Sequence, residues 1–224
     1  MFGAIAERYD FLNHLLSANL DRGWRRVCAR EVSRQIKTVS PKILDIGCGT
    51  ADLSIAFSNT GIVTGCDFCH EMLVRGARKA AGCDSRFPIN LLEADALALP
   101  FSDEVFDAAV SAFVLRNLTD MQSGLEEMRR VLCPGGVLGI LDFGMPRLSL
   151  LKRMYGFYFL KILPRAGKWI SGEEAPYRYL PSSVQKFPSA EELKEKIENA
   201  GFANVQVRRL AAGVAVLLTG IRKQ

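Results

Sequence analysis

Short apolar runs alternate with longer amphipathic stretches through the central part of the chain. Each apolar run has the length of a buried strand, and apolar positions recur at helical spacing between the runs. Strands that alternate with helices form a mostly parallel sheet whose two faces the helices cover. The pattern predicts a doubly wound α/β fold. The strands are expected at residues 42–46, 62–66, 89–92, 105–110 and 137–141, and the helices at 52–59, 70–81 and 120–132.

Different patterns occupy the two ends of the chain. Residues 1–37 carry apolar positions at helical spacing among charged ones, which predicts a helical N-terminal cap. Near the other end, Ser189 as the N-cap and Glu192 three residues later match a capping box that starts a helix. Two β-rich runs follow, at residues 203–210 and 214–221, and they are joined closely enough for a hairpin. The sheet is therefore expected to have seven strands and an antiparallel last strand.

The composition is that of an ordinary globular protein. The 224 residues are 49% hydrophobic and 24% charged, which suits a single domain over residues 1–224. No apolar run reaches the roughly 18 residues that a membrane span requires. A net charge of +5 favours an anionic neighbour, either a membrane leaflet or a nucleic acid.

The six cysteines match neither a disulfide framework nor a zinc site. They lie mostly inside apolar or motif stretches with no export signal before them, which favours a reduced, cytoplasmic setting. Cys66 and Cys69 have a C-x-x-C spacing, but no second close pair follows to complete four ligands. We therefore expect no metal site.

A glycine-rich turn follows the first expected strand. Gly47 and Gly49 stand where a buried strand gives way to a helix, and Asp45 precedes them. Glycines there let a ligand approach the backbone closely, and the start of a helix offers unpaired N–H donors. Asp45 could orient the loop or meet a cationic group of the ligand. The alternative interpretation is a tight strand-to-helix turn without a ligand, because two glycines alone are weak evidence.

The next two strand ends carry carboxylates. Asp67 ends the second strand, where a carboxylate can accept hydrogen bonds from both ribose hydroxyls of a nucleoside. Asp95 and Ala96 follow the third strand, where they are placed to contact an adenine. Asp52 stands where a nicotinamide-binding fingerprint would have a third glycine, and its carboxylate disfavours a phosphate. A sulfonium cofactor carries positive charge, so it is compatible with these acidic residues.

These segments resemble the successive motifs of class I S-adenosylmethionine-dependent methyltransferases, which have a Rossmann-like fold. The resemblance rests on residues 44–50, Asp67, Asp95 with Ala96, and residues 132–136. It implies S-adenosylmethionine as the cofactor, although Ala112 stands where family members often have a serine. The resemblance also implies which residues bind the cofactor: Asp45, Gly47, Gly49, Thr50, Asp67, Phe68, Asp95, Ala96 and Ala112.

Further segments are similar to the C-methyltransferases of menaquinone and ubiquinone biosynthesis. They are residues 2–13, 21–26, 115–120 and 177–183. This resemblance implies methylation of a ring carbon of a polyprenylated quinol, most directly demethylmenaquinol, with the benzoquinol of the ubiquinone pathway as a further acceptor. Two other possibilities stay open: a methyltransferase that acts on another small molecule or a nucleic acid, and a methyltransferase-like binding module without catalysis.

The resemblance also selects candidate catalytic residues. Arg116 could stabilise the phenolate of the quinol, Asn117 could orient the methyl donor or the quinol, and Tyr9 could close over the pocket. Arginine is not a credible base at neutral pH. The alternatives are a salt-bridge or helix-capping role for Arg116 and a packing role for Tyr9.

The stretch from residue 148 to residue 170 is basic, aromatic and free of acidic residues. It lies within an expected substrate- and membrane-facing insert, residues 146–188, and it suits the surface of an anionic bilayer. We therefore expect a peripheral protein at the inner face of the membrane, with a quinol as its substrate and no nucleic-acid partner. The alternative for this stretch is a helical insert that covers the sheet or forms the face of a homodimer.

Overall fold

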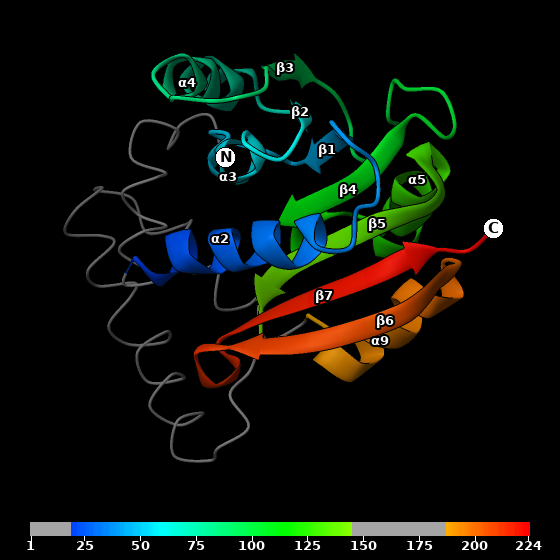
Figure 1. Cartoon of the computed structure of the whole chain (residues 1–224). Helices are drawn as coiled ribbons and strands as arrows, with labels where there is room; N and C mark the ends of the chain where they lie inside the picture. Colours follow the sequence, from blue (N-terminus) through cyan, green and yellow to red (C-terminus); the bar gives the residue numbers. More distant parts are fainter. Residues whose placement is uncertain (1–18, 145–186) are drawn as a thin grey trace.

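A computed structural model describes residues 19–144 and 187–224 of the chain. Its centre is a seven-stranded sheet in the order β3-β2-β1-β4-β5-β7-β6 (Figure 1). The strands are β1 Lys42–Ile46, β2 Ile62–Asp67, β3 Ile89–Glu93, β4 Phe106–Ala112, β5 Leu132–Phe143, β6 Phe202–Leu210 and β7 Ala215–Arg222. The α-helices are α2 Leu20–Ser33, α3 Asp52–Phe57, α4 His70–Ala81, α5 Met121–Val131 and α9 Ala190–Asn199.

The strand directions confirm the expected topology. Strands β1 to β5 pair in parallel, whereas β7 runs antiparallel to both β5 and β6. The parallel strands all end at one edge of the sheet, and the arrowheads of β4 and β5 mark this edge at the left of Figure 1. The loops that carry the predicted site residues follow these ends, as in other open α/β sheets.

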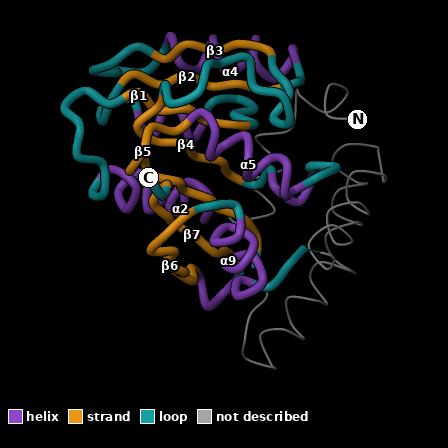
Figure 2. The backbone as a smooth tube through the Cα atoms, turned by 90° about the vertical axis from the view of Figure 1, so that its right-hand side faces the viewer, coloured by secondary structure: helices purple, strands orange, loops and turns teal. Residues whose placement is uncertain are grey.

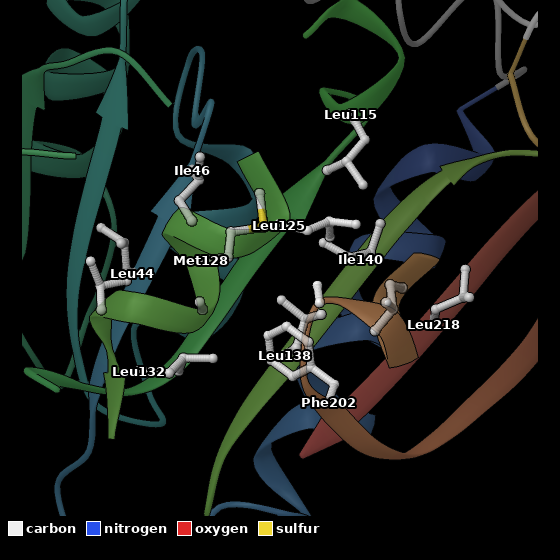
Figure 3. Packing of buried hydrophobic residues seen from close by; sticks show 14 of the residues in the cluster. Leu44, Ile46, Leu115, Leu125, Met128, Leu132, Leu138, Ile140, Phe202 and Leu218 are labelled. Atoms are coloured by element: carbon white, nitrogen blue, oxygen red, sulfur yellow. The ribbon is translucent and has the colours of Figure 1, made fainter. Parts of the chain in front are cut away.

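The helices cover the two faces of the sheet separately. On one face, the apolar sides of α2 and α3 pack against β1, β4, β5 and β7. On the other face, α5 and α9 pack on the same sheet, and Figure 3 shows Leu125 and Met128 of α5 close to Leu138 and Ile140 of β5. Figure 2 shows this layered arrangement from the side. Burial of each large aliphatic side chain contributes about 1.5–3 kcal/mol, which makes these two cores the main source of stability.

The boundaries differ from the predicted ones mainly at β5. This strand begins at Leu132 rather than at residue 137, because Leu132 pairs with Phe106 before the ladder shifts register between Phe106 and Ala108. It also continues through Asp142 to Phe143. The periodicity could not indicate the first part, since Pro134 and the glycines after it read as a turn.

The two ends of the chain are described in part. Helix α2 confirms the second half of the expected N-terminal cap, while residues 1–18 and the expected insert, except for its last residues from 187, lie outside the described residues. The capping box is confirmed: Ser189 Oγ accepts from the Glu192 N–H at 3.2 Å, and the Ser189 N–H donates to Glu192 Oε2 at 2.7 Å. In residues 19–144 and 187–224, no helix is both long and apolar enough to cross a membrane.

Candidate functional site

The glycine-rich turn has the backbone geometry that only glycine adopts readily. Gly47 and Gly49 have φ values of +67° and +53°. A Cβ atom on Gly47 would lie 2.4 Å from Cγ2 of Val114, so the loop after β4 fits closely against this turn. The Cys48 N–H donates to the Cys66 carbonyl at 2.9 Å, which fixes the turn to the end of β2. The turn is thus held by both strands that flank β1 in the sheet.

Asp67 joins the loops that follow β1 and β2. Its Oδ2 accepts the Gly49 N–H at 2.8 Å, and its Oδ1 accepts the Cys69 N–H at 2.9 Å. Burial raises the pKa of Asp67 above its ordinary value, and the backbone N–H donors act in the opposite direction. The carboxylate has further lone pairs that can accept hydroxyl hydrogens, as the ribose hypothesis requires.

A cavity of about 250 Å³ lies at this edge of the sheet. It contains eight of the residues predicted from the sequence, which come from the ends of four different strands. They are Gly47, Gly49, Asp67, Phe68, Asp95, Ala96, Ala112 and Asn117. Met72, Leu97 and Leu118 are among the apolar residues that also line it. A mostly apolar cavity with a few convergent polar groups is the usual form of a small-molecule site.

Two residues of this wall have distinct environments. Asp95 is exposed, and its Oδ1 accepts the Leu97 N–H at 2.9 Å, which fixes the turn after β3. Phe68 is 66% exposed although it is a large aromatic residue, and its ring borders the cavity next to Asp67. An exposed ring beside a carboxylate at the end of a strand is well placed to cover a flat nucleobase.

Asp45 and Thr50 border a second, smaller cavity behind the glycine turn. Asp45 is 1% exposed; its Oδ2 accepts from Ser54 Oγ at 2.6 Å, and its Oδ1 has no partner among the described residues. Burial raises the pKa of Asp45 to about 7, against the effects of Ser54 and Arg25. The Thr50 hydroxyl accepts from Lys79 Nζ at 3.1 Å. These two residues are therefore behind the turn, whereas the other predicted cofactor residues border the larger cavity.

Arg116 does not border either cavity. It lies in a short 3₁₀ helix, Leu115–Asn117, and its Nη1 donates to Oδ1 of Asp142 at 2.6 Å with both side chains buried. Its guanidinium also lies over the rings of Phe143 and Phe113, at 5.1 and 5.9 Å from their centroids. Arg116 thus forms the salt bridge that was expected as the alternative to a catalytic role. The action of Arg116 on a phenolate stays a prediction. Asn117 borders the large cavity, and its Nδ2 donates to the Phe113 carbonyl at 3.3 Å.

Comparison with known proteins decides the family. A family model described as the ubiE/COQ5 methyltransferase family matches residues 1–222. The chain belongs to the ubiE/COQ5 methyltransferase family. A demethylmenaquinone methyltransferase of Thermus thermophilus is 44% identical and the match covers 99% of this chain and 100% of that protein. A ubiquinone/menaquinone biosynthesis C-methyltransferase UbiE of Geotalea daltonii is 41% identical over 98% of this chain and 94% of its own length.

Solved structures show the same fold at low sequence identity. A possible histamine N-methyltransferase of Thermotoga maritima, described as S-adenosylmethionine-dependent, has a TM-score of 0.65 and 19% identity, covering 99% of this chain and 98% of that one. The [4+2]-cyclase SpnF also has a TM-score of 0.65 at 19% identity, covering 89% of this chain and 81% of that one. The ubiE/COQ5 methyltransferase thus has the class I methyltransferase fold, as predicted.

Several site residues of this methyltransferase were not predicted from its sequence. Arg25 borders the small cavity, and only its place in a family-like segment indicated it. Asp142 was missed because it follows the expected end of its strand, although a lone carboxylate after an apolar run is a usable signal. Phe113 has φ of +65°, an uncommon value for a bulky residue, and nothing in the sequence indicated it. Tyr9 lies outside the described residues, and its role stays a prediction.

Proposed function

We propose that this chain transfers a methyl group from S-adenosylmethionine to a ring carbon of a polyprenylated quinol, most directly demethylmenaquinol. The observation that carries the proposal is the 44% identity to a demethylmenaquinone methyltransferase over the whole of that relative. The benzoquinol of the ubiquinone pathway is the second acceptor, because other relatives bear both pathway names.

The residues at the strand ends fit S-adenosylmethionine. The backbone of the turn at Gly47 and Gly49 borders the large cavity, and Asp67 offers acceptors for a ribose. Asp95 and Phe68 border the place for a nucleobase. The carboxylates of Asp45 and Asp67 give this edge a negative potential that suits a cation. When bound, S-adenosylmethionine supplies an electrophilic methyl group on a positively charged sulfur.

The chemistry requires an activated ring carbon. A neutral aromatic carbon is a weak nucleophile, but loss of a hydroxyl proton gives a phenolate whose charge reaches the ortho carbon. Arg116 holds a fixed positive charge close to the end of β4, where it favours this phenolate electrostatically, through a water rather than by direct contact. Asn117 borders the cavity and orients the donor or the quinol. Tyr9 is proposed to close over the pocket.

The test is methyl transfer from labelled S-adenosylmethionine to reduced demethylmenaquinone and, in parallel, to the demethylated benzoquinol. Label in the naphthoquinol product alone supports menaquinone synthesis, and label in both supports dual use. We expect Arg116→Ala to lose most of kcat, whereas Arg78→Ala, which removes an exposed arginine of α4, retains it. No label in either quinol, with binding of S-adenosylmethionine intact, would contradict the quinol proposal and favour another acceptor or a binding module.

We further propose that the protein docks on an anionic membrane surface, where a polyprenylated quinol resides. Arg22, Arg26 and Arg30 recur every fourth residue on the exposed side of α2, and with Arg34, the C-cap of this helix, they form a basic stripe. Glu31 contacts Arg30 at 3.4 Å, Arg34 at 3.2 Å and Arg208 at 2.7 Å, so a single carboxylate is shared among three arginines. Such a stripe complements anionic lipid headgroups.

The docking proposal is tested by sedimentation with lipid vesicles. Wild type is expected to sediment with phosphatidylglycerol vesicles and not with phosphatidylcholine vesicles. The double variant Arg26→Glu/Arg30→Glu should lose this binding, whereas Arg78→Glu should keep it. Equal binding by wild type and the double variant would contradict a role for the stripe. The homodimer and the absence of a nucleic-acid partner stay predictions.

A further inference from the structure

The small cavity at the glycine turn shares part of its wall with the large one. It has a volume of about 30 Å³, enough for a small polar group rather than a second ligand. Gly47, Gly49, Ala112 and Phe113 border both cavities. A ligand in the large cavity can therefore extend one end into the small one.

Arg25 provides a fixed positive charge at the small cavity. It comes from α2, is only 9% exposed, and its Nη1 donates to Oδ2 of the buried Asp21 one helical turn earlier. Its guanidinium carbon lies 5.2 Å from the centroid of the Phe113 ring. The contact with Asp21 uses one of the five N–H donors of the guanidinium, which can bind a second carboxylate in the same plane.

Asp45 provides the opposite charge at the same cavity. Its Oδ1 is buried and has no hydrogen-bond partner in the described part of the chain. A buried acceptor without a partner is costly, so such an atom indicates a missing donor. A guanidinium and an unpartnered carboxylate oxygen around one small cavity match a zwitterion whose ammonium and carboxylate share one carbon atom.

We infer that Arg25 binds the α-carboxylate at the methionine end of the cofactor, while Asp45 accepts the neighbouring ammonium. This inference rests on S-adenosylmethionine as the cofactor of the proposed function. It assigns α2, which precedes the sheet, a direct part in cofactor binding. Asp21 acts through Arg25, as a positioning residue that orients the guanidinium.

The experiment measures dissociation constants by calorimetry for three ligands with wild type and Arg25→Gln. S-adenosylhomocysteine has the whole amino acid, its decarboxylated analogue lacks only the carboxylate, and 5′-methylthioadenosine lacks both charged groups. Because a hydrogen bond between charged groups contributes strongly to binding, we expect Arg25→Gln to weaken the binding of S-adenosylhomocysteine about 10- to 100-fold. The affinities for the other two ligands should change less than about twofold, because they make no contact with Arg25.

Two further variants separate binding from folding. Arg25→Gln removes the contact of Arg25 with the buried Asp21, so Asp21→Asn/Arg25→Gln repeats the measurement with the charge of Asp21 removed as well. Arg78→Gln removes an exposed arginine of α4, away from both cavities, and should leave all three affinities unchanged. Weakening of all three ligands alike in the double variant, or of none, would overturn the inference.

The same data distinguish this inference from the proposed function. Wild type that binds S-adenosylhomocysteine but methylates neither quinol would contradict the proposed acceptor and leave the role of Arg25 standing. Wild type that binds none of the three ligands would contradict both.

Discussion

Arg116 and Asp142 form a buried ion pair with 2.6 Å between Nη1 and Oδ1. The pair connects the loop after β4 with the end of β5, two segments that are adjacent in the sheet. Burial raises the pKa of Asp142, and the positive charge of Arg116 acts against this effect. The guanidinium is therefore held in a defined place next to the wall of the large cavity.

Removal of one partner of this pair is expected to be costly. Asp142→Ala leaves a buried guanidinium without its carboxylate, which should lower the free energy of unfolding by about 3–5 kcal/mol in urea denaturation. The double variant Arg116→Met/Asp142→Leu removes both charges and should recover most of this loss. A loss below about 1 kcal/mol for Asp142→Ala would mean that the pair is solvated rather than buried.

Gly47→Ala is expected to damage both the fold and the site. The new Cβ would lie 2.4 Å from Val114 at φ of +67°, so we expect a loss of about 2–4 kcal/mol in stability and at least about tenfold in affinity for S-adenosylhomocysteine. Gly135→Ala is the matched control, because Gly135 has φ of +78° but no atom within 4 Å of its Cβ position. Gly135→Ala should lower the free energy of unfolding by about 1 kcal/mol and leave the affinity for S-adenosylhomocysteine unchanged. Equal affinities for the two variants would contradict the close fit.

Asp67→Ala should weaken cofactor binding with a smaller effect on stability. It removes the acceptor of the Gly49 and Cys69 N–H groups as well as the proposed ribose contacts, so we expect about 10- to 100-fold weaker binding of S-adenosylhomocysteine. Asp107→Ala is a matched control: Asp107 accepts the Lys42 N–H at 2.9 Å, but at the amino end of β1. Unchanged affinity in Asp67→Ala would exclude the ribose role.

Asp45 should make stability depend on pH. Its pKa is about 7 in the folded protein and near 3.9 in an unfolded chain, so between these values the folded state binds more protons. Stability therefore falls as pH rises through this range, by up to about 1.4 kcal/mol per pH unit, and the full loss is present above pH 7. Denaturation from pH 5 to pH 8 should show this slope in wild type and lose it in Asp45→Asn. The same dependence of stability on pH in wild type and Asp45→Asn would contradict the raised pKa of Asp45. Arg25, Ser54 and Asp67 all affect this carboxyl group.

The sequence was sufficient for the architecture because its periodicities are local. Each strand of the parallel sheet is a short apolar run, and the turn at Gly47 and the carboxylate at Asp67 follow directly from their positions after such runs. The contacts between distant segments were not predictable in this way. Arg25 and Asp45 border one cavity only because α2 packs on the sheet, and Arg116 meets Asp142 only because β4 and β5 are neighbours in it. Pairings of this kind depend on tertiary packing, which a local pattern does not contain.

The two backbone hydrogen bonds to Asp67 have a consequence for the rate of turnover. Because the protein itself joins the loops after β1 and β2 through this carboxylate, the conformational entropy of these loops is lost during folding rather than at each binding event. The site is therefore preorganised at the ends of β1 and β2. Spent cofactor can therefore be exchanged for fresh cofactor in every cycle without the loops having to order again.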